Sequence, residues 1–349
     1  MIDRYLEDLE SRIDPNVEAE LAARWMDFAD GEFSGPFFAP RRTKQSPPRI
    51  DWPHVTVNEA FHDFDKMLIQ QFGRCSTWLS GEAGSLLCVR ANYGTSILAS
   101  LFGAELFMMA DEIDTLPTSW PLAGGADAVK RLVDAGAPDI HGGLGAKVFE
   151  MGRRFVAVRD KYPKIGRHVH IYHPDLQGPM DICEVLWGSG IFYELVDRPD
   201  LVKALLELVT ETYIAFMKEW DSIIGFSNHH AVHWEMLHGG HIMLRDDSAM
   251  NLSPAMYDEF VKPYDQRLFD VLGGGAVHFC GRGDHYIESL GRTRGLSAVN
   301  LSQPHLNDME KIFRNTVDRG IPILALPREA VDAALAAGRN LHGLVHSAE

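Results

Sequence analysis

The sequence predicts an α/β protein in which parallel strands alternate with crossover helices. Three observations support this class. Short apolar runs typical of buried strands recur from residue 84 onward, longer segments of helical periodicity separate them, and capping signals mark the starts of these segments. The runs lie at residues 86–90, 105–109, 168–172, 241–245, 276–280, 296–301 and 321–326, with a further one within 222–234. A closed barrel and an open doubly wound sheet both fit this alternation, and the lack of a GxGxxG motif weakens the dinucleotide-binding form of the open sheet.

Residues 1–83 do not show this alternation. Apolar residues at helical spacing predict one or two amphipathic helices between Tyr5 and Phe28, and a series of prolines makes residues 33–50 an extended loop. Thr56 and Glu59 form a capping box that opens a helix ending near Phe72. We therefore expect residues 1–83 to form a helical extension that packs on one α/β domain of residues 84–349.

Helix starts in this second part are predicted from capping residues. Each of three starts combines a capping side chain with a proline or glutamate shortly after it: Asp197 with Pro199, Ser253 with Pro254, and Asn307 with Glu310. Pro327 precedes the last predicted helix, which ends at Gly338.

Composition limits the classes of partner. Hydrophobic residues make up 46% of the 349 residues and charged residues 23%, which is the balance of a folded globular protein. The net charge of −16 disfavours nucleic acid and anionic membrane surfaces, and the nearest basic cluster, Arg41, Arg42 and Lys44, is interpreted as a solvated loop. Four widely spaced cysteines predict reduced thiols, and no apolar run is long enough to cross a bilayer. We expect a cytoplasmic protein that acts on a small molecule, without nucleic-acid or membrane partners.

Ligands of parallel α/β folds bind at the carboxyl ends of the strands, so the residues that close each apolar run are the first candidates. His278 and Cys280 lie two apart on one run, and strand alternation points both side chains to the same face. A thiolate and an imidazole that converge there can bind zinc, whereas a buried cysteine beside a hydrogen-bonded histidine is the structural alternative. No cysteine follows Cys280, so a third thiolate would have to come from upstream.

A second group of candidates lies in residues 229–247, which collect histidines and carboxylates. Such side chains can bind a metal or act as general acids and bases, although a surface loop is the plain alternative. Glu235 and His238 are the metal-ligand candidates of this segment, and Asp247, just beyond the run 241–245, is the catalytic candidate.

Polar residues also follow two other runs. His173 and Asp175 are further catalytic candidates, with a turn built by the neighbouring prolines as the alternative. Arg90 could bind a substrate carboxylate in a bidentate manner, and a structural salt bridge is equally compatible with its position. The substrate-binding candidates are Arg90, Asn92, Tyr93, Gln177 and Asn300.

Four segments resemble the uroporphyrinogen decarboxylase superfamily, which includes zinc-dependent methyltransferases that serve corrinoid proteins. They read DICEVLWGSGIFYELVDRPDLVKALLELVTE, DDSAMNLSPAMYDEFVKPYDQRLFDVL, VHFCG and LSAVNLSQPHLNDMEKI, within a resemblance that covers roughly residues 84–345. The resemblance implies a closed (β/α)8 TIM-type barrel rather than an open sheet, with residues 1–83 as its N-terminal helical extension.

The resemblance leaves two enzymatic branches open. The decarboxylases hold a substrate with many carboxylates through an arginine-rich N-terminal motif that is missing here, and a net charge of −16 also disfavours such a substrate. The methyltransferases bind zinc through an H-x-C pair and a later cysteine, which activates a thiol substrate; His278 and Cys280 match the pair, but Ala325, Leu326 and Pro327 stand near the position of the later cysteine.

The sequence therefore favours a methyltransferase-like activity on a small molecule through a metal-activated thiol or similar nucleophile. A decarboxylase (lyase) is the alternative, and a non-catalytic barrel that binds a small molecule is the second alternative. Zinc as cofactor and a corrinoid protein as methyl donor are what the resemblance implies. The oligomeric state stays open, with a homodimer as one candidate.

Overall fold

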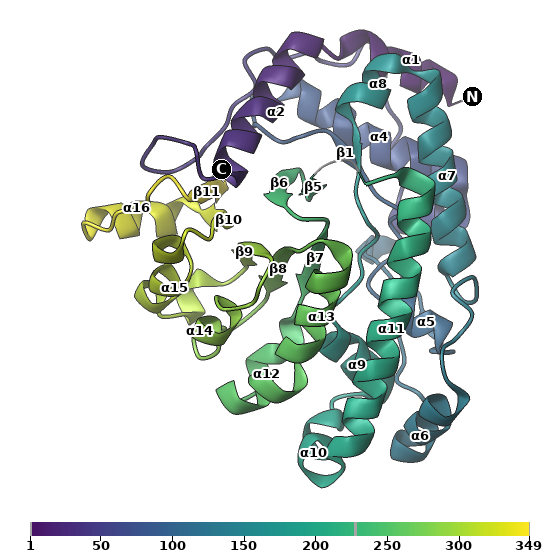
Figure 1. The fold of residues 1–349 in the computed structure, drawn as a ribbon. Helices are drawn as coiled ribbons and strands as arrows, with labels where there is room; N and C mark the ends of the chain where they lie inside the picture. Colours follow the sequence, from purple (N-terminus) through teal and green to yellow (C-terminus); the bar gives the residue numbers. More distant parts are fainter. Residues whose placement is uncertain (1, 227–228, 349) are drawn as a thin grey trace.

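The computed structural model describes residues 2–226 and 229–348 as an α/β structure (Figure 1). Its main sheet has five parallel strands in the order β11–β10–β9–β8–β7, and β1 pairs with β4 in a second parallel sheet. These strands are β1 (Cys88–Val89), β4 (His170–Ile171), β7 (Ile242–Arg245), β8 (Gly275–Phe279), β9 (Leu296–Leu301), β10 (Ile323–Pro327) and β11 (Val345–Ala348). The predicted α/β class with parallel strands is confirmed, and six of the predicted runs overlap these strands. The strand β11 was not predicted.

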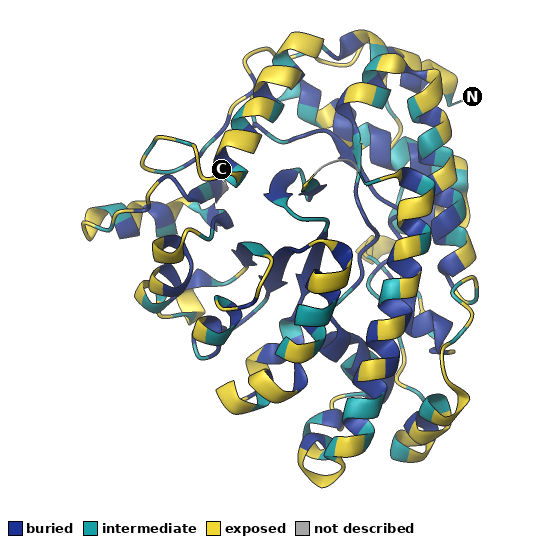
Figure 2. Cartoon of the chain, in the orientation of Figure 1, coloured by how far each residue is buried: buried dark blue, intermediate teal, exposed yellow. Residues whose placement is uncertain are grey.

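Helices surround the strands and turn their exposed faces outward (Figure 2). No helix in the described ranges is long and apolar enough to span a membrane. The helices are α1 (Asp3–Arg12), α2 (Pro15–Ala29), α3 (Val57–His62), α4 (Phe64–Ser80), α5 (Ile97–Leu101), α6 (Gly125–Ala135), α7 (Gly145–Lys161), α8 (Pro163–His168), α9 (Pro179–Trp187), α10 (Ile191–Asp197), α11 (Pro199–Ile224), α12 (Pro254–Phe260), α13 (Lys262–Leu272), α14 (Ile287–Leu290), α15 (Met309–Asn315) and α16 (Arg328–Ala336).

Two predicted runs do not join the parallel sheets. The run 105–109 contains β2 (Leu106–Phe107), which pairs antiparallel with β3 (Thr118–Ser119). The run within 222–234 begins inside α11 and includes residues 227–228, which lie outside the described residues; its end forms β5 (His230–His233), antiparallel to β6 (Met236–Gly239). Both runs were expected to form strands of a parallel sheet, and this was wrong, because a short apolar run does not reveal whether its neighbour is parallel or antiparallel.

The strands of the main sheet alternate between two apolar clusters. Leu244, Val277 and Val299 belong to the large cluster that includes the apolar faces of the helices. Their neighbours Ala276 and Ala298 belong to a second cluster on the inner face, together with residues of the β5–β6 hairpin. The small alanine side chains leave room for the hairpin, which lies between the main sheet and α2 (Figure 1).

The hairpin ends in an unusual two-residue turn. His233 pairs with Met236, so Trp234 and Glu235 form the turn, with φ angles of 45° and 65°. Two-residue hairpin turns of this kind favour asparagine and glycine, and a left-handed conformation costs other residues on the order of 1 kcal/mol each. The packing of the two side chains, described below, must offset this cost.

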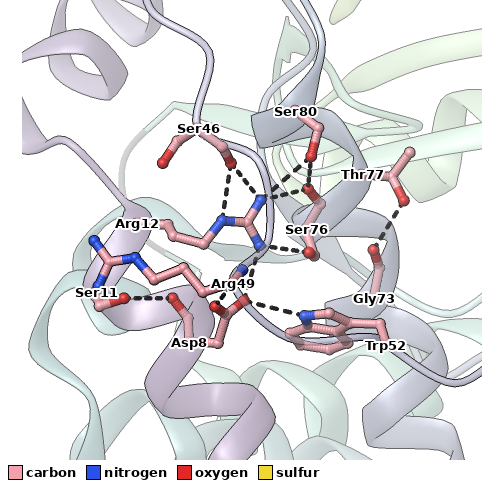
Figure 3. A network of polar contacts seen from close by, with 10 residues as sticks. All are labelled: Asp8, Ser11, Arg12, Ser46, Arg49, Trp52, Gly73, Ser76, Thr77 and Ser80. Carbon is pink, nitrogen blue, oxygen red and sulfur yellow. Dashed lines mark hydrogen bonds and ion pairs between the residues drawn. The ribbon is translucent and has the colours of Figure 1, made fainter.

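A buried arginine holds the N-terminal helix in place (Figure 3). Arg12 donates to Asp8 Oδ2 at 3.0 Å, to the Ser76 hydroxyl at 2.6 Å and to the Ser46 carbonyl at 2.8 Å. Asp8 in turn accepts from the indole of Trp52 at 3.1 Å. Because these residues come from α1, α4 and the proline-rich loop between α2 and α3, the network joins all three segments.

The proline-rich loop is not simply solvated. Arg42 is buried and forms a bidentate pair with Glu18 at 2.8 and 3.0 Å, so its interpretation as a solvated residue was wrong. The reason is that Glu18, on α2, supplies a buried countercharge that local composition does not reveal. Phe38 extends the main sheet: its N–H donates to the Val345 carbonyl at 2.8 Å, and Ser347 donates back to Phe38 at 2.8 Å. The domain boundary at residues 83/84 stays a prediction.

The helix starts follow the predictions with two local differences. Ser253 caps α12 and Pro199 opens α11, but the residue at the N-cap of α11 is Arg198 rather than Asp197. The predicted cap Asn307 was wrong by one residue, because Asp308 accepts from the Lys311 N–H at 3.1 Å and caps α15. The capping box of Thr56 and Glu59 is present, although the helix it opens ends at His62 and a new one begins at Phe64.

Replacing Thr56 with alanine is expected to destabilise the protein by about 1 kcal/mol, because the N–H of Glu59 loses its side-chain acceptor. Urea unfolding of the variant measures this difference. Thr77→Ala is the matched control, since that hydroxyl lies in the middle of α4 and bonds the Gly73 carbonyl, which already belongs to the helix. Equal stability of the two variants would contradict a capping role.

Candidate metal centre

Three of the candidate residues converge at the carboxyl ends of β7 and β8. One ligand atom each from Asp247, His278 and Cys280 lies within 4.8 Å of the other two. His278 Nε2 is 3.4 Å from Cys280 Sγ and 3.6 Å from Asp247 Oδ1. The backbone N–H of Cys280 donates to the same carboxylate oxygen at 2.7 Å, which fixes the Asp247 side chain against the neighbouring strand end.

Strand register explains why these residues meet. Arg245 pairs with His278, and His278 pairs with Asn300, so the three residues lie side by side across β7, β8 and β9. Strand alternation directs all three away from the face that carries Val277 and the helices. Asp247 and Cys280 each follow by two residues, and they extend the same inward face beyond the strand ends.

The two separations measured from His278 Nε2 are compatible with a shared divalent metal. A zinc ion about 2.1 Å from nitrogen and about 2.3 Å from sulfur sets those two ligand atoms about 3.6 Å apart. The observed 3.4 Å and 3.6 Å separations from His278 Nε2 agree with this geometry. One carboxylate, one imidazole and one thiol give three protein ligands, which leaves a fourth position for a substrate atom, as catalytic zinc sites require.

Asn300 orients the imidazole. Its amide nitrogen donates to the Leu324 carbonyl at 2.8 Å, so its oxygen faces His278 as the acceptor for Nδ1, 2.5 Å away. This bond places the proton on Nδ1 and leaves Nε2 free toward Asp247 and Cys280. Burial lowers the pKa of His278, which favours the neutral ring that binds metals. Asn300, predicted as a substrate contact, lies in the structure as the partner of His278.

Replacing Asn300 with alanine is expected to weaken metal binding about 10- to 100-fold, because His278 loses the bond that fixes its tautomer. Zinc titration against a competing chelator measures the change. Asn315→Ala is the matched control, because that buried amide also bonds a main-chain carbonyl, that of Lys311 in its own helix α15. Unchanged zinc affinity in Asn300→Ala would show that Asn300 does not position a metal ligand.

The surroundings of Cys280 keep its thiol in place. The thiol lies 3.6 Å from the Ser302 hydroxyl. Partial burial raises the pKa of Cys280, and the contact with Ser302 opposes this rise only in part. A positive charge beside the thiol would be needed to hold it as a thiolate, and a bound divalent metal supplies such a charge.

Asp181 fixes the loop that carries Asp247. Its carboxylate accepts from the N–H of Asp247 at 2.9 Å and from the N–H of Ser248 at 2.8 Å. Gln177, a predicted substrate contact, donates to the same carboxylate at 3.3 Å. Asp181 was not among the candidate residues, because its role depends on a contact across 66 residues that no local pattern signals.

Asp175 lies between two buried arginines. It pairs with Arg90 through one oxygen and with Arg245 through the other. Burial alone would raise the pKa of Asp175, but the charges of Arg245 and Arg90 outweigh it and lower the pKa. The structure thus shows for Arg90 the salt bridge that was one of the two interpretations of its position. Asp175 is the partner in this salt bridge and is not one of the three converging residues Asp247, His278 and Cys280.

The other candidates lie outside the group of three. His173 accepts from the Met243 N–H at 2.9 Å through Nε2, and its Nδ1 is 2.6 Å from the Pro174 carbonyl, so main-chain groups occupy both ring nitrogens. Tyr93 is buried against Phe61. Glu235 pairs with Arg74 at 3.1 Å, and His238 contacts the Gly239 carbonyl at 2.8 Å. Their predicted catalytic, substrate-binding and metal-binding roles stay predictions.

Trp234 joins the arginine pair to the metal-ligand candidates. The guanidinium of Arg245 lies 4.7 Å from the centre of the Trp234 ring, and the imidazole of His278 lies 5.0 Å from it with perpendicular planes. Neither Trp234 nor Arg245 was a candidate in the sequence. The hairpin turn that brings Trp234 here carries no asparagine or glycine signal, so local sequence could not place it.

Three cavities border this region. One of 400 Å³ is lined by Trp234 and Ala325, and one of 640 Å³, between α15 and α16, is lined by Ser302. A third of 560 Å³ is lined by Arg90 and Asn92, two of the predicted substrate contacts. Volumes of this size suit small-molecule ligands.

Comparison with known proteins supports the fold. No protein-family model matches the chain, and no curated protein matches it. Among solved structures the chain is similar to a methyltransferase from Methanosarcina mazei, at 16% sequence identity and a TM-score of 0.66, over 94% of this chain and 92% of that chain. At this identity the similarity establishes a shared α/β fold over nearly the whole length.

Proposed function

We propose that this protein is a (β/α)8-type barrel enzyme that binds zinc through Asp247, His278 and Cys280 and transfers a methyl group to a small thiol. The observation that carries the proposal is the convergence of these three donor atoms within 4.8 Å at the strand ends. A shared fold with a methyltransferase and the H-x-C resemblance support the reaction class.

Each residue of the site has a part in this proposal. Asp247, His278 and Cys280 would hold the metal, Asn300 would keep His278 Nε2 unprotonated, and Asp181 would hold the Asp247 loop. A bound zinc ion lowers the pKa of a thiol substrate, so that the thiol reacts as a thiolate near neutral pH. Asp247 replaces the later cysteine of the zinc methyltransferases, since Ala325 stands near that position.

Closure of the two parallel sheets into one barrel is also part of the proposal. Phe38 continues the main sheet beyond β11, and the Pro40 carbonyl accepts from the Gly84 N–H at 3.1 Å, close to β1. On the other side, the Gly178 N–H donates to the Arg245 carbonyl at 2.8 Å, which links the segment after β4 to β7. These contacts bridge both gaps between the two parallel sheets and support ring closure.

The decarboxylase alternative is less well supported by the charges near the site. Arg90 is paired with Asp175, Arg74 with Glu235, and Arg42 with Glu18, so each of these arginines already has a carboxylate partner. A substrate with many carboxylates would have to compete with all three. A corrinoid protein as methyl donor remains part of the methyltransferase proposal, as does a cytoplasmic location.

Metal analysis and a transfer assay test the proposal. We expect about one zinc per chain after dialysis against zinc, and zinc-dependent loss of methylcobalamin in the presence of small thiols. Protein that binds no zinc would refute the metal centre, and zinc-loaded protein that transfers no methyl group to any thiol tested would refute the reaction. Efficient turnover of uroporphyrinogen would establish the alternative.

A further inference from the structure

The 400 Å³ cavity beside the hairpin tip has a distinctive wall. Three of the chain's seven tryptophans line it, although they come from separate elements: Trp25 from α2, Trp78 from α4 and Trp234 from the hairpin turn. Trp25 is buried, whereas Trp78 and Trp234 are half-buried and leave ring surface open. Indole rings are the side chains whose π faces bind cations most strongly.

The wall includes one carboxylate, that of Glu235, which is paired with Arg74. Glu235 lines the cavity with a side chain that is 14% exposed, and its cationic partner Arg74 is a residue of the neighbouring 560 Å³ cavity, with 44% of its side chain exposed. His346, which also lines the cavity, stays neutral because burial lowers its pKa to about 3. The net charge of −16 adds a general attraction for cations.

Trp234 already takes part in one cation contact. The Arg245 guanidinium lies 4.7 Å from its ring centre. The turn that positions Trp234 and Glu235 is held by the Glu235 carbonyl, which accepts from the Leu86 N–H at 2.9 Å. Two residues with left-handed backbones, Trp234 and Glu235, thus line one cavity, and such strained positions cluster at ligand sites.

We propose that this cavity binds a methylated onium cation, meaning the quaternary ammonium or sulfonium group of a small molecule. Such a cation has no N–H or O–H to donate, so indole faces and one carboxylate are the groups that recognise it. The cavity lies next to the candidate metal centre, because Trp234 contacts both the cavity and His278. Binding of the cation is independent of the proposed methyl transfer and of the metal.

A pair of ligands of equal shape tests the proposal on the unmodified protein. Choline and 3,3-dimethyl-1-butanol differ only in having a charged nitrogen or a neutral carbon at the centre of the same methyl cluster. Calorimetry or tryptophan fluorescence is expected to show choline binding at least about tenfold more tightly. Equal affinities would mean that the cavity is merely apolar, and no choline binding at millimolar concentration would overturn the proposal as well.

Variants locate the binding site. Glu235→Gln and Trp78→Leu are expected to weaken choline binding at least about tenfold, since each removes one attractive group. Glu150→Gln and Trp120→Leu are the matched controls. Glu150 pairs with Arg154 at 2.9 Å on the surface, and Trp120 is an exposed residue that directly follows β3. Variants at the cavity that bind choline like the controls would overturn the assignment.

Zinc content measured on the same samples separates this proposal from the metal centre. Glu235→Gln is expected to bind choline more weakly and to retain zinc. Loss of zinc in that variant would make Glu235 a metal ligand and would overturn its assignment to the cation site. An unmodified protein that binds choline but no zinc would refute the metal centre and leave the cation site standing.

Discussion

Replacing Cys280 with serine is expected to remove bound zinc while leaving the fold largely intact. Zinc affinity should fall at least about 100-fold, because a serine hydroxyl stays protonated near neutral pH and is a far weaker ligand than a thiolate. The side chain is only partly buried and lies beside the Ser302 hydroxyl, so a serine there keeps a hydrogen-bond partner. Elemental analysis and thermal unfolding of the same sample measure both effects.

Cys183→Ser is the matched control for this prediction. Cys183 is 0% exposed in α9 and belongs to the large apolar cluster. Its serine variant is expected to lose about 1–3 kcal/mol of stability, because a hydroxyl is buried among apolar groups, and to retain zinc. If the unmodified protein binds no metal and Cys280→Ser is destabilised, then Cys280 is an ordinary packing residue and not a metal ligand.

The main features of the metal centre could be predicted because they depend on strand alternation. His278 and Cys280 share a face through a two-residue period, and the ends of parallel strands meet at one edge. Asp247 was a candidate because it lies just beyond the predicted strand 241–245, whereas its neighbour Asp246 was not a candidate. The structure separates them: Asp246 is buried, and Asp247 reaches the candidate ligands.

Features that depend on distant partners could not be predicted. The burial of Arg42 requires Glu18, and the position of Trp234 requires a turn without asparagine or glycine. The strand contacts of Phe38 and β11 involve very short segments near opposite ends of the chain, so periodicity gives no signal. Local propensity and alternation define elements, whereas the contacts that orient Trp234 and Asp181 arise only in the folded chain.

Replacing Asp175 with alanine is expected to destabilise the protein by about 3–5 kcal/mol, because Arg90 and Arg245 would remain buried without their shared countercharge. Both arginines are buried, so water cannot replace the carboxylate without opening the structure. The melting temperature should fall by roughly 4–7 °C. Urea unfolding provides the free energy of unfolding for the same comparison.

A surface pair and a pH series separate this buried cluster from ordinary ion pairs. In Asp134→Ala, the lost carboxylate is 63% exposed beside Lys130, so stability is expected to change by less than about 1 kcal/mol.

The pKa of Asp175 is lowered in the folded protein, so the contribution of Asp175 to the free energy of unfolding is present above its unfolded pKa of about 3.9. This contribution is lost as the pH falls through the lower folded pKa. The stability difference between the parent and Asp175→Ala should therefore be constant from neutral pH to about pH 5 and should shrink only in stronger acid. A variant as stable as Asp134→Ala at pH 7 would show that the two arginines do not depend on Asp175.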